Sequence, residues 1–116
     1  MQPVPVPQER PADYVAAVLA VAELIPPGKV LTYGDIAELL ESGGPRQVGR
    51  ALSRGTRDVP WWRVLRAGGY PPRGLALHAR PHYDDEGTPL HLPVPSDTGG
   101  YRVDLRAARW LPAAPD

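Results

Sequence analysis

Apolar residues recur at helical spacing in three stretches of the first half of the chain. Residues 12–25 carry one apolar stripe and are followed by Pro26-Pro27-Gly28, so we expect a helix that ends there. Residues 33–41 and 45–54 repeat the pattern over shorter lengths. The positions expected to face the core are Val15, Val18, Leu19, Ala22 and Ile25 in the first helix, Ile36, Ala37, Leu39 and Leu40 in the second, and Val48, Ala51 and Leu52 in the third.

Polar residues and glycines mark the ends of the second and third helices. Residues 29–33 favour a short extended segment, and Thr32 and Asp35 have the spacing of a capping box. Glycines at 43 and 44 end the second helix, Pro45 suits the first turn of the next, and Gly55 is placed to cap its end. Two short helices joined by a glycine-containing turn predict a helix-turn-helix unit.

The patterns beyond the third helix are shorter. Residues 62–65 favour a strand and Gly68-Gly69 a tight turn, which together would form a wing. The expected fold class is therefore mainly α with a small β wing, a winged helix-turn-helix domain. Residues 75–86 favour a short helix, and residues 101–105 favour a terminal strand or a tail docked by Trp110. We expect a flexible arm at 1–10, a winged-helix domain at 11–75 and an extension at 76–116 that packs on it.

Positive charge is concentrated in one part of a chain whose net charge is zero. Residues 45–74 contain seven arginines against Asp58 alone, whereas the segments before and after are acidic. Arg46, Arg50 and Arg54 are four residues apart and share the outward face of the third helix. A local arginine face indicates a surface for the phosphates of DNA or RNA; the alternative is a solvated face with internal ion pairs.

Composition excludes several kinds of chemistry. The chain contains no cysteine, which excludes disulfides, thiolate metal sites and a cysteine nucleophile. His78, His82 and His91 lack the spacing of metal ligands, so we expect no metal and no cofactor. The longest apolar stretch is too short to span a bilayer and no signal peptide is visible. We therefore expect a cytoplasmic protein, associated with the nucleoid if it is bacterial.

Three motifs resemble the DNA-binding domain of O6-alkylguanine-DNA alkyltransferases. Residues 25–37 resemble that family's Ile-Pro-x-Gly-x-Val-x-Thr-Tyr-Gly-x-Ile-Ala signature. Residues 44–51 resemble its Arg-Ala-Val-Gly recognition helix, and residues 60–64, Pro-Trp-Trp-Arg-Val, stand where the family carries Pro-Cys-His-Arg-Val. The motifs follow the family's order and spacing over residues 12–75, so the resemblance covers more than half of the chain.

The departures from this pattern bear on function. The family's alkyl-accepting cysteine falls on Trp61, and the histidine that helps to generate its thiolate falls on Trp62. Alkyl transfer needs a thiolate and a base, and an indole nitrogen is not nucleophilic enough to replace sulfur. The chain is thus similar to alkyltransferase-like proteins, which carry tryptophan at the cysteine position and are not enzymes. Trp62 departs even from that subfamily, and we interpret it as a buried packing residue; the family's asparagine-proline hinge is also missing before Pro60.

The resemblance implies roles for individual residues. Arg46 matches the arginine finger that fills the space of a flipped nucleotide, and Tyr33 matches the tyrosine that helps to rotate its 3′ phosphate. Gly49 and Ala51 match small residues that let the helix enter a minor groove. The expected DNA-binding set is Tyr33, Arg46, Gln47, Gly49, Arg50, Ala51 and Arg54, and the expected lesion pocket is Tyr33, Trp61, Arg63 and Arg73.

The function implied is recognition of O6-alkylguanine in double-stranded DNA without repair. Subfamily members pass the lesion to nucleotide excision repair proteins, and we expect a monomer that contacts no membrane. Phosphate contacts by Arg50 and Arg54 should make binding weaken as salt rises. Two alternatives stay open: a winged-helix transcription regulator that reads sequence, and a degenerate relative that serves as an interaction module.

Overall fold

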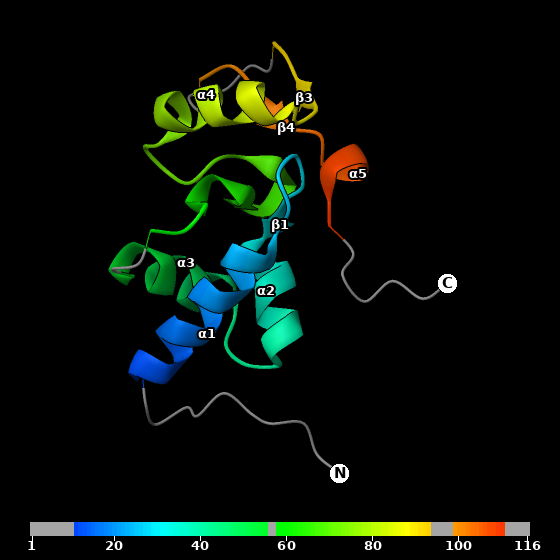
Figure 1. Cartoon of the computed structure of the whole chain (residues 1–116). Coiled ribbons are helices and arrows are strands. Elements are labelled where there is room, and N and C mark those ends of the chain that lie inside the picture. Colours follow the sequence, from blue (N-terminus) through cyan, green and yellow to red (C-terminus); the bar gives the residue numbers. More distant parts are fainter. Residues whose placement is uncertain (1–10, 56–57, 94–98, 111–116) are drawn as a thin grey trace.

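The computed structural model of the chain describes residues 11–55, 58–93 and 99–110, which form short helices and four two-residue strands. The arm expected at residues 1–10 lies outside these ranges. Figure 1 shows α1–α3 at one end of the molecule and α4 with β3 and β4 at the other. The elements are α1 Pro11–Leu24, β1 Leu31–Thr32, α2 Tyr33–Leu40, α3 Pro45–Arg54, β2 Val64–Leu65, α4 Ala76–Glu86, β3 Leu90–His91, β4 Arg102–Val103 and α5 Leu105–Ala108.

The three predicted helices of the first half are confirmed, and they enclose the first core cluster. The stripe on α1 is buried from Val18 to Ile25, and it packs against Val48 and Ala51 of α3. One core position was predicted wrongly: Leu39 is 45% exposed, because it lies on the outer face of α2 while Ile36 and Ala37 fill the space beneath. The predicted core of the helix-turn-helix unit otherwise stands.

Local signals place the ends of α2 and α3. The capping box is confirmed: the Asp35 backbone N–H donates to the Thr32 hydroxyl oxygen at 3.0 Å, and the Thr32 N–H donates to the Asp35 carboxylate at 2.9 Å. Gly55 follows α3, but its φ of −69° is open to any residue. The small residue matters for a different reason: a Cβ there would lie 2.7 Å from a Leu19 methyl group, so any larger residue would need the Leu19 side chain to shift. The C-terminal end of α3 therefore rests directly on α1.

The segment expected to be a wing has a different structure. Trp61–Arg63 form a 3₁₀ turn, and β2 pairs in parallel with β1 in the register Leu31 to Val64 and Thr32 to Leu65. The predicted strand at 62–65 was thus half right. The tight turn expected at Gly68-Gly69 is present, with the Arg66 N–H donating to the Tyr70 carbonyl at 2.9 Å, but among the described residues no strand follows it to complete a hairpin. The fold class, mainly helical with small sheets, is confirmed.

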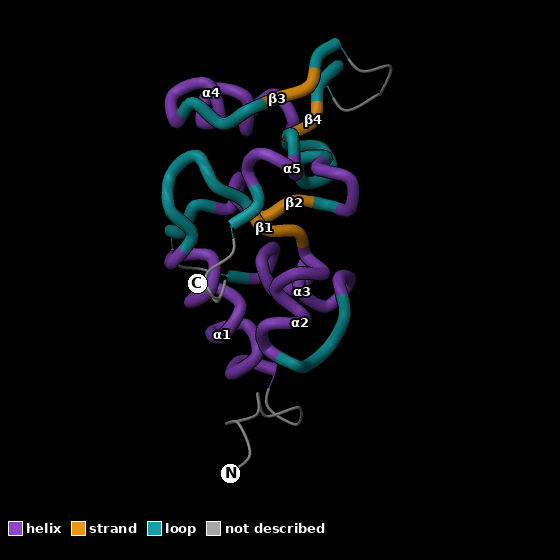
Figure 2. The backbone as a smooth tube through the Cα atoms, turned by 90° about the vertical axis from the view of Figure 1, so that its right-hand side faces the viewer, coloured by secondary structure: helices purple, strands orange, loops and turns teal. Residues whose placement is uncertain are grey.

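The two-stranded ladder of β1 and β2 separates two cores. Leu31 and Val64 belong to the first cluster, whereas Val30 and Leu65 belong to a second cluster with residues of α4, β4 and α5. Consecutive strand residues point to opposite faces, so each face of the ladder serves one core. Figure 2 shows β1 and β2 at this middle level.

The second half of the chain completes the second core. The helix expected at 75–86 is present as α4 despite Pro81. The segment expected at 101–105 forms β4, which pairs antiparallel with β3, and then α5. Val30 joins this end of the chain, since its N–H donates to the Ala108 carbonyl and its carbonyl accepts from the Trp110 N–H. Over the described ranges, none of the helices is both long and apolar enough to cross a membrane.

Candidate nucleic-acid interface

The outer surface of α3 carries the predicted arginine face. Arg46, Arg50 and Arg54 are all exposed, while Val48 and Ala51 turn inward. The helix begins cleanly because Pro45 occupies its first turn and the Gln47 side chain accepts a hydrogen bond from the Gly44 N–H at 3.0 Å. The exposed cationic groups thus stand on a short, well-capped helix that follows the turn of a helix-turn-helix unit.

A cleft of about 580 Å³ opens beside α3, and we call it the Trp61 cleft. Three of the four residues predicted for a lesion pocket line it: Tyr33, Trp61 and Arg73. They come from the start of α2, the 3₁₀ turn before β2 and the loop before α4. Its volume lies in the range of small-molecule and base pockets, about 300 to 1,000 Å³, and more of its wall is apolar than polar.

Tyr33 and Gly49 form one contact of the cleft wall. A Cβ on Gly49 would lie 3.2 Å from Cε2 of the Tyr33 ring, so the absence of a side chain lets the ring lie against α3. Burial raises the pKa of the Tyr33 phenol, and the nearby Arg66 cation opposes that rise. Tyr33 therefore presents a neutral hydroxyl at neutral pH.

Trp61 and Trp62 are held at right angles. Their ring centroids are 5.6 Å apart with planes at 87°, and Trp62 stacks on His82 at 3.6 Å and 9°. Trp61 also meets the edge of His82 at 5.8 Å. Such edge and stacked pairs add stability beyond the area they bury. The wall of the cleft is therefore backed by a packed aromatic group and α4.

Glu86, at the end of α4, fastens the turn that carries the tryptophans. Its carboxylate accepts from Trp62 Nε1 at 2.9 Å, from Arg63 Nη2 at 2.6 Å and from the Gly28 N–H at 3.0 Å. Burial alone would raise the pKa of Glu86, but the hydrogen bonds from Arg63, Gly28 and Trp62 outweigh it and lower the pKa. The ionised carboxylate thus joins three segments. Trp62 was expected to be a buried packing residue; it packs on His82, but it is half-buried rather than fully buried.

Two predicted site residues lie elsewhere. Arg63 does not reach the Trp61 cleft, because its guanidinium group is bound to Glu86 and to the Ile25 carbonyl at 2.8 Å. Its side chain is 14% exposed. Ala51 is 3% exposed and packs in the first core, so it does not line the Trp61 cleft and offers little surface to a groove. Gly49, two residues earlier and on a different face of α3, is the small residue that faces the cleft.

Sequence reasoning missed four residues around this site. Asp58 and His78 line the Trp61 cleft, and His82 and Glu86 hold the tryptophans from behind. No local signal identifies them, since Glu86 follows Trp62 by 24 residues and lies in a segment without a motif. Throughout the ranges that the structure covers, no group of three or more histidines or carboxylates is arranged to hold a metal ion.

The fold and the site define a helix-turn-helix DNA-binding domain, because an arginine-bearing second helix stands beside an aromatic cleft. The chain belongs to the family described as the 6-O-methylguanine DNA methyltransferase DNA-binding domain, whose model matches residues 13–81. Within that family it is an alkyltransferase-like protein. The matched range agrees with the residues 12–75 over which the motifs resemble the family.

Solved structures and a curated relative resemble the chain. The crystal structure of S. pombe Atl1 in complex with damaged DNA containing O6-carboxymethylguanine has a TM-score of 0.73 and 28% identity, over 89% of this chain and 99% of that one. A second, of S. pombe ATL in complex with DNA, has the same score and coverage and 29% identity. A DNA base-flipping protein of Vibrio parahaemolyticus is 40% identical over 61 residues, which span 49% of this chain and only 60% of that protein.

Proposed function

We propose that this chain is a non-enzymatic DNA damage-recognition protein for O6-alkylguanine in double-stranded DNA. It binds in the minor groove, flips the alkylated nucleotide into the Trp61 cleft and leaves the lesion for nucleotide excision repair. One observation carries the proposal: an aromatic cleft lies directly beside an exposed arginine helix. The similar S. pombe Atl1 was solved with O6-carboxymethylguanine DNA, and a 40% identical relative is a base-flipping protein, which supports the same reading.

Arg46 is the residue that we assign to the base stack. It stands exposed in the first turn of α3, where its side chain can extend beyond the helix into the space left by the flipped nucleotide. Tyr33, at the cleft wall, is neutral and able to donate its hydroxyl proton to the phosphate of the flipped nucleotide. Gly49 keeps the cleft side of α3 narrow, which suits a minor groove about 6 Å wide.

Selectivity for the lesion has two sources. An O6-alkylated guanine pairs poorly, so extruding it costs less than extruding a normal base. Once extruded, the purine and its alkyl group meet the Trp61 indole, which removes apolar surface from water and adds stacking. Arg73, also in the cleft wall, supplies a cation beside the electron-rich ring. Each source is worth on the order of 1 to 3 kcal/mol.

The chain carries out no chemical step on the lesion. With Trp61 and Trp62 in place of the family's cysteine and histidine, this chain offers no thiolate to accept the alkyl group. The lesion therefore stays intact, and the bound complex serves as a marker for the repair proteins. Binding as a monomer is sufficient for this task, because one cleft takes one nucleotide.

The test is fluorescence anisotropy on two duplexes that differ only in one O6-methylguanine, at moderate salt. We expect the chain to prefer the methylated duplex by at least tenfold, and an Arg46→Ala variant to lose most of that preference. Arg106→Gln, which removes an exposed arginine from α5, is the matched control and should bind as the unaltered chain does. Recovered DNA should still contain the methyl group.

The other outcomes have defined meanings. Equal affinity for both duplexes would indicate a general DNA-binding domain without lesion preference. An affinity that depends on the flanking sequence rather than on methylation would indicate a transcription regulator. No binding to either duplex would indicate an interaction module.

A further inference from the structure

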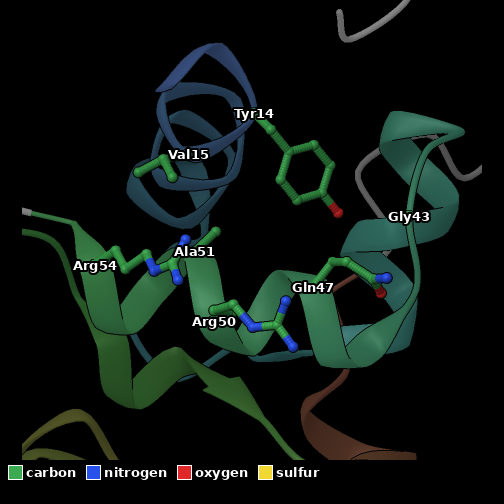
Figure 3. A pocket seen from close by; sticks show the side chains of 7 residues that line it. All are labelled: Tyr14, Val15, Gly43, Gln47, Arg50, Ala51 and Arg54. Atoms are coloured by element: carbon green, nitrogen blue, oxygen red, sulfur yellow. The ribbon is translucent and has the colours of Figure 1, made fainter. Parts of the chain in front are cut away.

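A second cleft, of about 280 Å³, lies on the other side of α3 from the Trp61 cleft. We call it the Arg50 cleft. Figure 3 shows it between α1 and α3: Tyr14 extends from α1 toward the loop at Gly43, and Arg50 and Arg54 extend from α3. Its location beside the arginine helix raises the question of which part of a DNA duplex it meets.

The geometry of α3 places the two clefts on opposite sides of one ridge. Successive residues of an α-helix are rotated by about 100°. The Trp61 cleft uses α3 residues 49, 52 and 53, and the Arg50 cleft uses residues 47, 50, 51 and 54. The centres of these two sets are therefore nearly half a turn apart. With Val48 pointing into the core, Arg46 lies on the outward ridge between them.

The Arg50 cleft is built for a small anion. Two guanidinium groups line it, and no acidic residue is among the described residues of its wall. In the part of the chain that the structure covers, neither Arg50 nor Arg54 has a carboxylate within ion-pair distance. Guanidinium groups bind phosphate oxygens through charge-assisted, often paired, hydrogen bonds. A phosphate group matches this site in charge and in hydrogen-bond capacity.

The side of the cleft opposite the arginines is fixed in advance. The Tyr14 hydroxyl donates to the Ser42 carbonyl at 3.1 Å. Gly43 has a φ of +71°, and a Cβ there would lie 2.5 Å from the Tyr14 hydroxyl oxygen, so only glycine permits this approach. The ring of Tyr14 is therefore held against the loop between α2 and α3. This wall of the cleft is formed before any ligand binds.

We propose that the Arg50 cleft binds backbone phosphates of the undamaged strand, opposite the strand whose nucleotide enters the Trp61 cleft. A helix in a minor groove has one sugar–phosphate backbone on each side. If one cleft of α3 receives a nucleotide from the damaged strand, the cleft on the opposite side of α3 faces the other strand. This inference rests on the proposed function and adds that the affinity for DNA depends on the backbones of both strands.

Neutral phosphate analogues give the test, because methylphosphonate linkages remove charge from one chosen strand. Four duplexes carry one O6-methylguanine: one unmodified in its backbone, one neutral over three linkages of the undamaged strand near the lesion, one neutral over the matching linkages of the damaged strand, and one neutral in both. Each is titrated with the unaltered chain, with the double variant Arg50→Gln/Arg54→Gln, and with Arg106→Gln as the control. Circular dichroism checks that the variants are folded.

We expect neutral linkages in the undamaged strand to weaken binding by the unaltered chain roughly tenfold, and the double variant to bind the unmodified duplex roughly tenfold less tightly. The two changes should not add, because each removes the same contact. In the double variant, the slope of log affinity against log salt should be smaller by about two. Neutral linkages in the damaged strand should weaken both proteins alike.

Two results would overturn the inference. Non-additivity confined to the damaged strand would place the Arg50 cleft on that strand instead. Full additivity for both strands, or a double variant that binds like the unaltered chain, would mean that the cleft does not contact DNA and is open to an acidic partner protein.

The proposed function fails separately from this inference. It is tested by the ratio of affinities for methylated and unmethylated duplexes, which the double variant should keep. A chain without lesion preference would lose the proposed function, while the strand dependence of its binding would still report on the Arg50 cleft.

Discussion

Trp61 and Trp62 are adjacent in the chain but have different surroundings. Trp61 lines the cleft beside α3, whereas Trp62 stacks on His82 and donates its indole N–H to Glu86. Trp61 therefore faces the cleft, and Trp62 anchors the turn that carries both residues.

Trp61→Ala should remove lesion preference while leaving general DNA binding. Base stacking on an aromatic side chain is worth about 1 to 3 kcal/mol, so affinity for the methylated duplex should fall by about 5-fold to 150-fold. Affinity for the unmethylated duplex should change little, because its bases stay in the stack. Competition binding with both duplexes measures this, and Trp61→Phe should keep part of the preference. A parallel loss on both duplexes would contradict a role confined to the lesion.

Glu86→Gln should destabilise the fold and change its response to acid. Removing the charge leaves Arg63 partly buried without its partner, at a cost of about 2 kcal/mol at neutral pH. The pKa of Glu86 is lowered from its ordinary 4.5, so its stabilising effect is present above pH 4.5 and is lost as pH falls through the lowered value. Urea midpoints between pH 7 and pH 3 should converge for the two proteins at the acid end.

Asp84→Asn supplies the control for Glu86. Asp84 is 57% exposed and pairs with Arg80 one helical turn away, an ion pair that contributes about 0.5 kcal/mol or less. A loss of stability as large as that of Glu86→Gln would mean that the acidic end of α4 matters only through its total charge.

At the scale of elements, the junction between β1 and α2 positions Tyr33. Thr32 is both the last residue of β1 and the cap of α2, and its capping partner Asp35 is also ion-paired with Arg109 at 3.0 Å. Because Tyr33 is the first residue of α2, the cap fixes where the phenol enters the cleft wall. The start of this helix thus links the fold to the site.

Thr32→Ala should cost about 1 kcal/mol of stability, the usual effect of losing a helix cap. The Asp35 N–H would then lose the hydroxyl oxygen that accepts its hydrogen bond. Because Thr32 is only 7% exposed, water would not easily replace that acceptor. Thr32→Ser keeps the hydroxyl and should retain most of the stability. The melting temperatures of the three proteins test this prediction. If Thr32→Ala and Thr32→Ser have the same melting temperature, the loss of stability does not come from the hydroxyl group.

At the scale of the whole molecule, the two cores share one ladder. Leu31 and Val64 pack on one side of the ladder, and Val30 and Leu65 pack on the other. If the ladder came apart, residues of both cores would therefore be exposed to water. The second core contains two buried tyrosines. The Tyr83 hydroxyl donates to the Trp62 carbonyl at 2.6 Å, and the Tyr101 hydroxyl donates to the Ala76 carbonyl at 2.7 Å. Unfolding should therefore be a single cooperative transition.

Alkaline solution should test that coupling. Burial raises the pKa of Tyr101 to about 12 and raises that of Tyr83 further. Their unfolded value is 10.0, so the stability they contribute is complete below pH 10 and is lost as pH rises above it, by about 1.4 kcal/mol per pH unit for each tyrosine. Urea unfolding at pH 9, 10 and 11 measures the slope. Tyr101→Phe should lower the slope by the share that Tyr101 contributes, about 1.4 kcal/mol per pH unit, and an unchanged slope would contradict this assignment.

The sequence predicts some of these structural features, such as the third helix, but not others, because the others depend on contacts between distant parts of the chain. The bounds of α3 follow from Pro45 and from short-range periodicity, so they could be predicted residue by residue. The β-prone residues of 62–65 suggested a strand, but contacts with Glu86, 23 or 24 positions later, accompany a 3₁₀ turn there. Likewise the family motif pointed to small residues on α3 but did not distinguish Gly49 on the surface from Ala51 in the core.

The right-angled tryptophan pair has an optical consequence. Two indole rings with centroids 5.6 Å apart and planes at 87° couple their electronic transitions, and the coupling depends on the mutual orientation of the rings. Trp62 is clamped, while Trp61 faces the cleft, so a purine that stacks there perturbs one member of the pair. The near-ultraviolet circular dichroism and the emission of the chain thus report occupancy of the cleft without any attached dye.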